Sequence, residues 1–369
     1  MTRSMVISPL RGSLELLARI EATEERMTKG IRASQGGRHI LEGLRTTAQG
    51  TQARVRRDPR ENGCISSRPS VEDAPDETVQ FSTMALSLSP LIRFGTSTWT
   101  YEGWQGQVYK REYAKSTFSR ECLGEYCQYQ YEGKPLFRTV GNDATFYRPP
   151  TANQLRHYLT QIPEDFQMCF KVWEEITIPI YAKHARYGVR AGQPNPRFLD
   201  AKLFQDLVLT PYREARFEPH TGVFLFEFQR HDMPADEFFS RLDQFFLMLP
   251  REFRYAVEIR NPGLLGMPYS LMLSRHGVAH VYNHWSGMPT LAQQHTLMQG
   301  FTAAFTVLRL LTPLGMSYEA AKKRAEPYTK IVEELPQMRR ETVQLVRQAV
   351  GAGRRAYVGQ QSGVIKVLH

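Results

Sequence analysis

Apolar and polar residues follow two different patterns along this chain, and the change falls near residue 90. Beyond that point, short apolar runs rich in β-branched and aromatic residues recur at regular intervals. Such runs are typical of buried strands when turn-forming or helical stretches separate them. The pattern predicts eight strands, at residues 92–97, 144–147, 168–173, 223–228, 255–260, 278–283, 305–310 and 355–359.

The stretches between these runs have the spacing of amphipathic helices. The clearest is 235–248, where Phe238, Leu242, Phe245 and Leu249 recur at three- and four-residue intervals and so share one helix face. Further helices are predicted at residues 151–161, 198–215, 270–276, 291–299 and 318–350, the last interrupted by Pro327 and Pro336.

Eight strands that alternate with helices in about 280 residues favour the α/β class and a TIM-type (β/α)8 barrel of parallel strands. The rival fold is an open, doubly wound sheet, which is expected to carry a glycine-rich phosphate loop after its first strand. Here Gly103 and Gly106 are flanked by Trp104 and Gln105, so the G-x-G-x-x-G pattern is missing. We therefore expect a barrel over residues 89–369.

Residues 1–88 differ in kind, because Phe81 is their single aromatic residue. Apolar residues have helical spacing only over 14–27, which predicts a disordered or weakly helical N-terminal arm. An alternative is that these residues are translated upstream sequence and that Met84 is the natural start. The basic stretch Arg54-Val55-Arg56-Arg57 could contact nucleic acid, but the acidic residues of the same arm argue against it.

Composition is that of a globular protein, with 41% hydrophobic and 23% charged residues among 369. A net charge of +10 permits an anionic substrate or a polyanionic partner without demanding either. The four cysteines form no CxxC pair, so neither a disulfide framework nor a zinc site is expected, and a cytoplasmic location is the simplest account. No apolar run approaches the roughly 20 residues of a membrane span.

Polar and aromatic side chains gather where the predicted strands end, which is the working face of a barrel. The residues expected to bind a substrate there are Trp99, Tyr101, Trp104, Asn142, Tyr147, Lys171, Asn283 and His284. The alternative for Trp99 and Trp104 is that they simply pack in the core. His276, His280 and His284 recur at four-residue spacing, but Gly277 breaks any helix there, so no metal site is expected.

Two carboxylates, Glu227 and Glu258, lie inside apolar strands, where burial is costly unless each is paired or protonated. Strand alternation places Glu258 and Arg260 on one face, and Arg309 has the same position in its own strand. We expect Glu258, Glu227, Arg260 and Arg309 to carry the chemistry, with the pKa of one carboxyl raised and the other kept ionised. The alternative is a structural Glu–Arg network that fixes the strand register.

Several of these residues lie in motifs through which the chain resembles the family called domain of unknown function 72, or YecE-like proteins. The motifs are Gly95-Thr96-Ser97-Thr98-Trp99-Thr100-Tyr101, Asn142-Asp143-Ala144-Thr145-Phe146-Tyr147-Arg148-Pro149, Phe170-Lys171 and Val257-Glu258-Ile259-Arg260-Asn261-Pro262. The resemblance covers roughly residues 92–359 and implies a TIM-type barrel, but it implies no established reaction.

The chain departs from the family pattern at two places. Family members commonly carry Gln where this chain has Glu227, and their last strand usually ends in a double Asn before a further loop and helix. Here Ala356-Tyr357-Val358-Gly359-Gln360-Gln361 runs into the end of the sequence, so we expect the last βα unit to be truncated or altered.

The favoured function is a metal-independent enzyme without a cofactor, which uses carboxylate acid–base chemistry on a small polar or anionic, sugar- or phosphate-like substrate. Lys171, Arg260 and Arg309 suit a carboxylate or phosphate group. The alternatives are a non-catalytic binding protein, for a small ligand or nucleic acid, and a family member inactivated by its altered C-terminus.

Overall fold

The structure is a computed structural model, and it describes residues 89–131, 133–326 and 333–360, which all fall in one compact unit. The predictions for residues 1–88, including the arm, the start at Met84 and the basic stretch, lie outside the described residues, as do those for 361–369. None of the described helices is long and apolar enough to cross a membrane.

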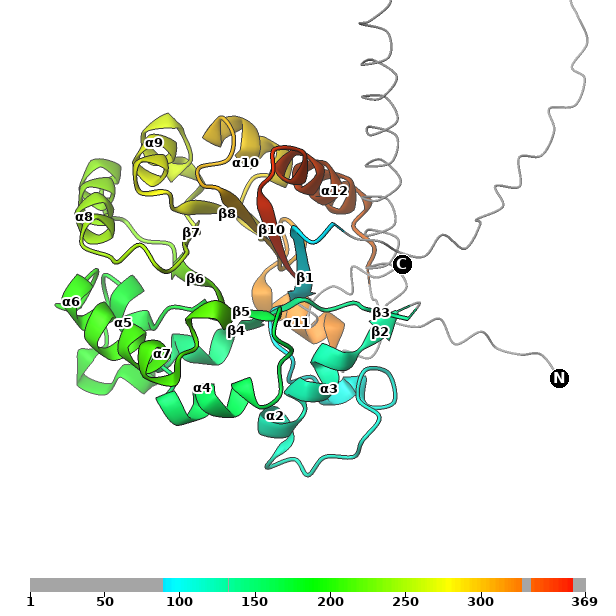
Figure 1. Cartoon of the computed structure of the whole chain (residues 1–369). Coiled ribbons are helices and arrows are strands. Elements are labelled where there is room, and N and C mark those ends of the chain that lie inside the picture. Colours follow the sequence, from blue (N-terminus) through cyan, green and yellow to red (C-terminus); the bar gives the residue numbers. More distant parts are fainter. Residues whose placement is uncertain (1–88, 132, 327–332, 361–369) are drawn as a thin grey trace, which may run out of the picture. The chain divides into compact units, whose positions relative to one another are not determined.

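Eight strands form one parallel sheet in the order β1-β10-β9-β8-β7-β6-β5-β4. The strands are β1 (Ile92–Thr96), β4 (Thr139–Asn142), β5 (Gln167–Lys171), β6 (Thr221–Phe228), β7 (Tyr255–Ile259), β8 (Ala279–His284), β9 (Phe305–Leu310) and β10 (Arg355–Gln360). In the view of Figure 1, which is roughly down the barrel, the sheet curls into a ring with helices outside it. The predicted TIM-type barrel is confirmed.

The two edge strands, β1 and β4, meet at a seam that local contacts hold together. The amide of Arg138 donates to the carbonyl of Phe94 across it (2.9 Å). The buried hydroxyl of Tyr126 accepts from the amide of Thr96 (3.0 Å) and donates to the carbonyl of Thr139 (3.2 Å). This phenol thus satisfies backbone groups of both edges that would otherwise be buried without partners.

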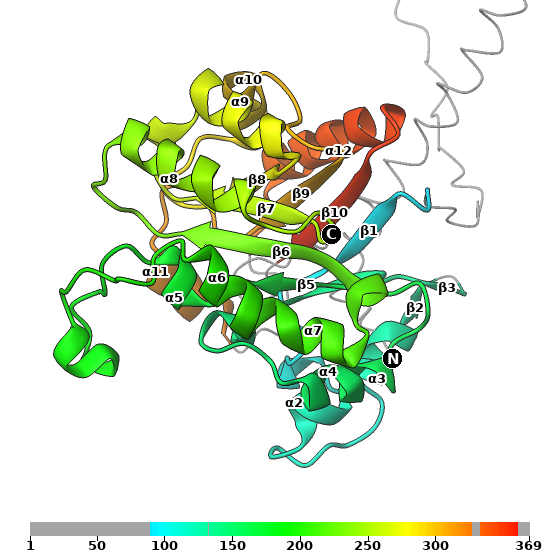
Figure 2. The same cartoon turned by 60° about the vertical axis from the view of Figure 1, so that its left-hand side comes forward.

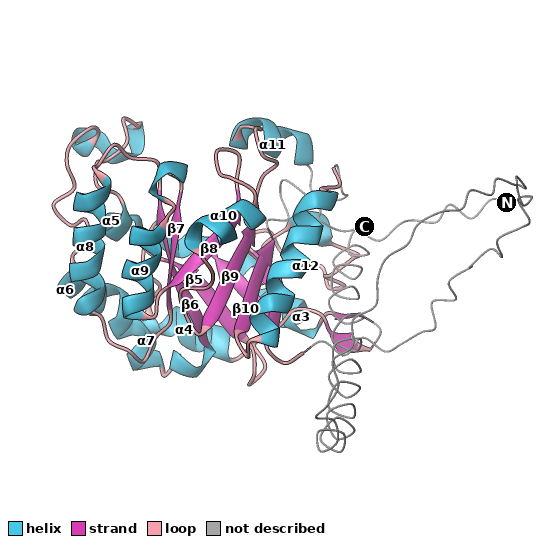
Figure 3. Ribbon diagram, turned by 90° about the horizontal axis from the view of Figure 1, so that it is seen from above, coloured by secondary structure: helices cyan, strands magenta, loops and turns pink. Residues whose placement is uncertain are grey.

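Helices cover the outside of the ring, as Figures 1 and 3 show. In chain order they are α2 (Phe118–Glu121), α3 (Leu123–Gln128), α4 (Ala152–Leu159), α5 (Glu174–Thr177), α6 (Ala201–Leu203), a π-helical stretch (Phe204–Leu209), α7 (Thr210–Ala215), α8 (Ala235–Leu247), α9 (Met267–His276), α10 (Leu291–Met298), α11 (Tyr318–Ala325) and α12 (Pro336–Gly351). Short 3-10 helices span Glu102–Trp104, Asp143–Phe146, Ala185–Arg190, Glu218–His220 and Pro262–Leu264, and β2 (Gln130–Tyr131) pairs with β3 (Lys134–Pro135) in a hairpin.

The helix starts follow sequence signals. Thr151 and Thr290 each begin a helix with a capping box, in which the threonine hydroxyl and a Gln three residues later bond each other's backbone amides. Helix α8 buries Phe238, Leu242 and Phe245 on one face, as its spacing predicts. The predicted helical region 318–350 contains two helices, α11 and α12.

One predicted strand is wrong. Residues 144–147 belong to the 3-10 helix Asp143–Phe146 and the residue after it, and the strand is β4, which ends at Asn142. The glycine in β4 interrupts its apolar run, so the sequence pattern did not predict a strand there. That glycine is needed because a Cβ on Gly141 would lie 2.7 Å from the carbonyl oxygen of Ser97 across the seam.

Apolar residues form separate layers inside and outside the barrel. The inner cluster is Cys169, Val223, Leu225, Ala256, Ala279, Val281, Ala303, Phe305, Val307 and Tyr357, and it is distinct from the large cluster between strands and helices. Because side chains alternate along a strand, the next inward positions beyond this cluster lie at the strand ends. Helix α11 lies at the C-terminal end of the barrel, and the β2–β3 hairpin lies at the opposite end (Figures 2 and 3).

Candidate functional site

Six ionisable side chains meet at the C-terminal end of the barrel, and we call them the strand-end cluster. They are Asp143 from the 3-10 helix after β4, Lys171 from β5, Glu227 from β6, Glu258 from β7, Arg260 directly after β7, and Arg309 from β9. Glu227 and Glu258 stand side by side in the register of β6 and β7. The sequence predicts five of these six residues at the site.

Three cations surround the carboxylate of Glu227. Its Oε2 lies 2.9 Å from Lys171 Nζ, 3.1 Å from Arg260 Nη2 and 3.0 Å from Arg309 Nη1. Its Oε1 accepts from Nε2 of the Gln229 side chain. Burial alone raises the pKa of Glu227, but the charges of Lys171, Arg260 and Arg309 outweigh burial and hold it well below its usual value. Glu227 is therefore ionised at neutral pH, and it is not a carboxyl whose pKa is raised.

Glu258 is the most deeply buried member of the cluster, with 0% of its surface exposed. Its Oε2 accepts from Arg309 Nη1 at 2.5 Å. Its Oε1 lies 2.6 Å from Arg260 Nη2, an ion-pair distance, although the N–H is not aligned with that oxygen for a hydrogen bond. The predicted pairing of Glu258 with Arg260 on one strand face is confirmed.

Arg309 connects the buried carboxylates to a partly exposed one. Its Nη2 lies 3.2 Å from the carboxylate of Asp143, whose side chain is 41% exposed. Burial lowers the pKa of Arg309, but Glu258, Asp143 and Glu227 together raise it above its usual value. Arg309 is thus a permanently charged and fixed centre of the cluster.

The charges of the cluster are balanced only when Asp143 is included. The five deeply placed members comprise three cations and two carboxylates, an excess of one positive charge. Asp143 supplies the third carboxylate from the more exposed side. An anion that displaced Asp143 from Arg309 would meet this positive charge, which water would screen little.

Several buried polar atoms near the cluster have no hydrogen-bond partner among the described residues. They are Nε and Nη1 of Arg260, Oδ1 of Asn283 and Oγ of Ser97. The guanidinium of Arg260 lies 4.0 Å from the ring centre of Trp285, a contact that uses its face and leaves its N–H groups free to donate. Lys171 Nζ similarly lies 4.2 Å from the ring centre of Phe146. The aromatic rings therefore fix the positions of both cations, while Nε and Nη1 of Arg260 remain able to donate to a ligand.

Asn283 has the position that the sequence predicts, because it stands beside Arg309 in the register of β8 and β9. Its Nδ2 donates to the carbonyl of Ile259 (3.0 Å). His284, the next residue, faces the other way, and its Nδ1 contacts the carbonyl of Thr312 (2.7 Å). Burial lowers the pKa of His284, so this last residue of β8 is neutral at pH 7, and it is not a member of the cluster.

The structure does not bring the predicted aromatic residues into the cluster. Trp99 donates from Nε1 to the carbonyl of Ser119, and its ring packs edge-on against Tyr158 (5.6 Å), so it faces the helices. Trp104 is buried in the same outer layer, and the ring of Tyr101 lies tilted against it with the ring centres 4.8 Å apart. For both tryptophans the core-packing alternative is therefore the better description.

Two further predicted residues lie at the margin. Asn142 is buried at the end of β4, and its side chain hydrogen-bonds the hydroxyl of Tyr158, which places it toward α4. Tyr147 is 63% exposed, and the guanidinium of Arg186 lies 5.4 Å from its ring centre. A substrate-binding role for Tyr147 stays a prediction, because its exposed ring is free to meet a ligand.

Sequence reasoning missed Asp143, Trp285 and Phe146. Asp143 lies in the quoted Asn142–Pro149 motif, but assigning a strand to residues 144–147 drew attention away from the turn that presents it. Trp285 follows His284 directly, and the strand-end rule that selected His284 applies equally to its neighbour. Among the described residues, no group of three or more His, Cys, Asp or Glu side chains could hold a metal ion.

A family model and solved structures of DUF72 family proteins are similar to this chain. A family model described as "Protein of unknown function DUF72" matches residues 93–358. Among solved structures, a DUF72 family protein from Enterococcus faecalis is 14% identical, with 75% of this chain and 91% of that chain covered and a TM-score of 0.52. A DUF72 family protein from Thermotoga maritima is 20% identical, with 75% and 94% covered and a TM-score of 0.48. No curated protein matches the chain.

Proposed function

The chain belongs to the domain of unknown function 72 family, and we propose that its barrel binds a small molecule with a carboxylate or phosphate group at the strand-end cluster and performs acid–base chemistry on it. The observation that carries this proposal is Arg260, a buried guanidinium whose Nε and Nη1 have no partner among the described residues. Buried N–H donors without partners are costly, and an oxyanion that accepts from them recovers that cost.

The cations of the cluster suit this role because they are fixed before a ligand arrives. Arg260 and Arg309 form ion pairs with Glu227 and Glu258. Lys171 and Arg260 also pack against the faces of aromatic rings. Donors that need no reorganisation stabilise developing negative charge most effectively. In this proposal Lys171, Arg260 and Arg309 bind the anionic group, and the two glutamates position them.

Asp143 is the carboxylate best placed to exchange a proton with a bound molecule. It is the partly exposed acid of the cluster, and its contact with Arg309 (3.2 Å) is the longest of that arginine's ion pairs. A ligand oxygen that takes its place on Arg309 leaves Asp143 beside the ligand as a general base or acid. Glu227 is unsuited to donate a proton at neutral pH, because its pKa is held well below its usual value by the cations around it, which outweigh burial.

A second candidate is binding without catalysis. It is favoured by the complete pairing of Glu227 and Glu258 with cations, which leaves Asp143 as the cluster's sole accessible acid. Both candidates predict the same ligand class, so turnover separates them.

The test is a thermal-shift screen of the full chain against sugar phosphates, sugar acids and hydroxycarboxylates. A ligand that binds the cluster should stabilise the wild type, and this stabilisation should be lost in Lys171→Gln and Arg260→Gln. Lys202→Gln, which changes an exposed lysine paired with Asp206, is the matched control and should retain it. Stabilisation that survives both cluster substitutions would contradict the proposal.

Asp143→Asn then tests the chemistry. If Asp143 exchanges the proton, the variant should bind the same ligand at least as tightly, since a competing carboxylate is gone, but should not turn it over. Turnover by Asp143→Asn at the wild-type rate would contradict the assigned role, and binding without turnover in the wild type would favour the second candidate.

A further inference from the structure

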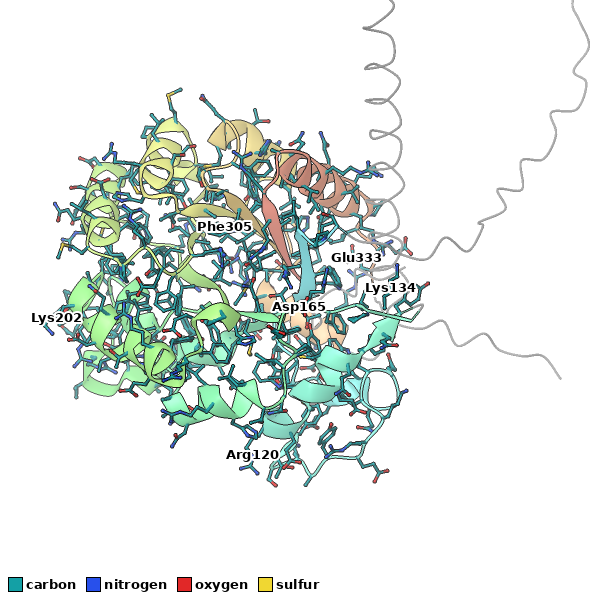
Figure 4. The ribbon with its side chains drawn as sticks, in the orientation of Figure 1. Arg120, Lys134, Asp165, Lys202, Phe305 and Glu333 are labelled. Carbon is teal, nitrogen blue, oxygen red and sulfur yellow. The ribbon has the colours of Figure 1, made fainter. Side chains whose placement is uncertain are left out.

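A second group of charged side chains lies at the opposite, N-terminal end of the barrel. We call it the arginine cluster, and its members are Arg93 near the start of β1, Arg138 just before β4, Arg254 just before β7, and Arg355 at the start of β10. By strand alternation Arg93, Arg254 and Arg355 point inward with Gly95, Ala256 and Tyr357. Figure 4 labels two residues from this end of the barrel, Asp165 just before β5 and Phe305 at the start of β9. In this view both lie toward the middle of the ring of helices and strands.

Arg93 is the most buried member, with 10% of its side chain exposed. Its Nη1 donates to the carbonyl of Asp165 (2.5 Å) and lies 3.4 Å from the carboxylate of the same residue. Its Nε has no hydrogen-bond partner among the described residues. Burial lowers the pKa of Arg93, the nearby Arg138 and Arg355 lower it further, and Asp165 offsets only part of this.

Two of the other arginines, Arg138 and Arg355, lie close enough to Arg93 to lower its pKa. Arg138 Nη2 lies 3.0 Å from the carboxylate of Asp165. Arg355 Nη1 donates to the side-chain oxygen of Gln167 (3.2 Å), and its Nε has no partner among the described residues. The hydroxyl of Tyr357 donates to the same oxygen of Gln167 (2.7 Å), so Arg355 and this inward-facing phenol share a partner. Burial and Cys169 raise the pKa of Tyr357, and the charge of Arg254 lowers it.

The arginine cluster is not balanced, in contrast to the strand-end cluster. Within the described part of the chain, Asp165 pairs with Arg93 and Arg138, and Arg254 and Arg355 form no ion pair, so the four cations have one paired carboxylate among them. Asp165 is itself 58% exposed and joins the cluster from its outer side. A structural plug at this end of a barrel would be more stable with matched charges, because like charges close together repel strongly when partly buried.

We propose that the arginine cluster is a binding site for a phosphate group, carried either by inorganic phosphate or by a small phosphate monoester. A doubly charged tetrahedral anion neutralises most of the excess charge. Guanidinium groups from several strands can donate to its oxygens in pairs, which is the geometry that arginine offers phosphate. Asp165 occupies the arginine donors in the free protein, so it competes with the ligand. The site is distinct from the one proposed at the strand-end cluster.

The test measures the affinity of the full chain for inorganic phosphate, and separately for glycerol phosphate, by calorimetric titration at constant ionic strength. Arg355→Gln and Arg138→Gln should each weaken binding by about tenfold or more, because each removes a charge-assisted donor. Asp165→Asn should strengthen binding, because it removes the competing carboxylate from Arg93 and Arg138. Arg213→Gln, an exposed arginine paired with Glu252, is the matched control and should leave the affinity unchanged.

The opposite signs expected for Arg138→Gln and Asp165→Asn separate a ligand site from a structural role, which predicts no change in phosphate affinity for either. Loss of phosphate binding in Lys171→Gln together with unchanged binding in Arg355→Gln would overturn this inference while supporting the strand-end site. Absence of binding of either phosphate compound to the wild type would overturn it as well.

Discussion

A carboxylate with no exposed surface persists inside a barrel only when its charge is matched, and Glu258 is matched by two arginines. Arg309 donates to one of its oxygens and Arg260 approaches the other. The same arginines also contact Glu227, so each charge in the strand-end cluster depends on several others. In such a network, removing one member leaves the rest buried without compensation.

We therefore expect Glu258→Gln to lower the free energy of unfolding by about 3–5 kcal/mol, measured by chemical denaturation at neutral pH. The substitution keeps the shape of the side chain but leaves Arg260 and Arg309 with one carboxylate fewer. The matched control is Glu237→Gln, which removes an exposed carboxylate paired with Arg241 and should cost about 0.5 kcal/mol or less.

A small cost for Glu258→Gln, together with loss of turnover of a ligand found by the screen, would instead assign the catalytic role that the sequence predicts for Glu258. Residues that serve chemistry are often not optimised for stability, so their replacement can leave stability unchanged or raise it. The stability change thus separates the positioning role proposed for Glu258 from a catalytic one.

The sequence predicted the inward direction of several strand side chains, but it did not predict the direction of Trp99 beyond the end of β1. Alternation alone places Glu227, Glu258, Arg309, Lys171 and Asn283 on the inner face, because a strand fixes the direction of each side chain. No such rule applies after the strand ends. The sequence pattern is compatible with Trp99 pointing either into the barrel or toward the helices. In the structure its ring packs against Tyr158, which fixes its direction toward the helices.

At the scale of elements, the seam between β1 and β4 is where the barrel depends most on single residues. Gly95 faces the carbonyl of Thr139, and a Cβ at Gly95 would lie 1.9 Å from that oxygen. The hydroxyl of Tyr126 joins the same two strands only while they stay this close. The glycine in the first motif is therefore required by the approach of two backbones, whatever it does for a ligand.

Gly95→Ala should lower the free energy of unfolding by at least about 3 kcal/mol, because backbone atoms of β4 must move to admit the methyl group. Amide hydrogen exchange of Thr96 should accelerate, since its bond to Tyr126 crosses the opened seam. Gly263→Ala is the control, because a Cβ there meets nothing within 4 Å, and its effect should stay within about 1 kcal/mol. Similar costs for the two alanine variants would contradict the importance of the seam.

The position of β4 was the element that sequence pattern could not supply. Its four residues include the glycine that the seam requires, which weakens the strand pattern. The following Thr145-Phe146-Tyr147 has the β-branched and aromatic residues typical of a strand, although Thr145 and Phe146 belong to a 3-10 helix. Both ends of β9 were predicted correctly, because no glycine interrupts its apolar run. The start of β6 was predicted two residues late, because Gly222 lies at its second position, before the apolar run.

At the scale of the whole molecule, the barrel holds two charged groups separated by apolar side chains. Along β9, Phe305 lies at the N-terminal end, Val307 in the middle and Arg309 in the strand-end cluster. Four residues of strand correspond to about 13 Å. The inner layer between the two ends contains Val307 and Tyr357 among other apolar residues, so within the described residues no chain of charged groups connects the two ends.

The two ends should therefore act independently, and a double-mutant cycle can measure this. Arg355→Gln at one end and Glu258→Gln at the other should have effects on the free energy of unfolding that add to within about 0.5 kcal/mol, because residues this far apart without shared partners rarely couple. Glu258→Gln combined with Arg260→Gln is the positive control, since these two side chains contact each other and should show a coupling of about 1 kcal/mol or more. A coupling of that size between Arg355 and Glu258 would mean that the packed interior transmits changes from one mouth of the barrel to the other, and the two proposed sites would then have to be treated as one.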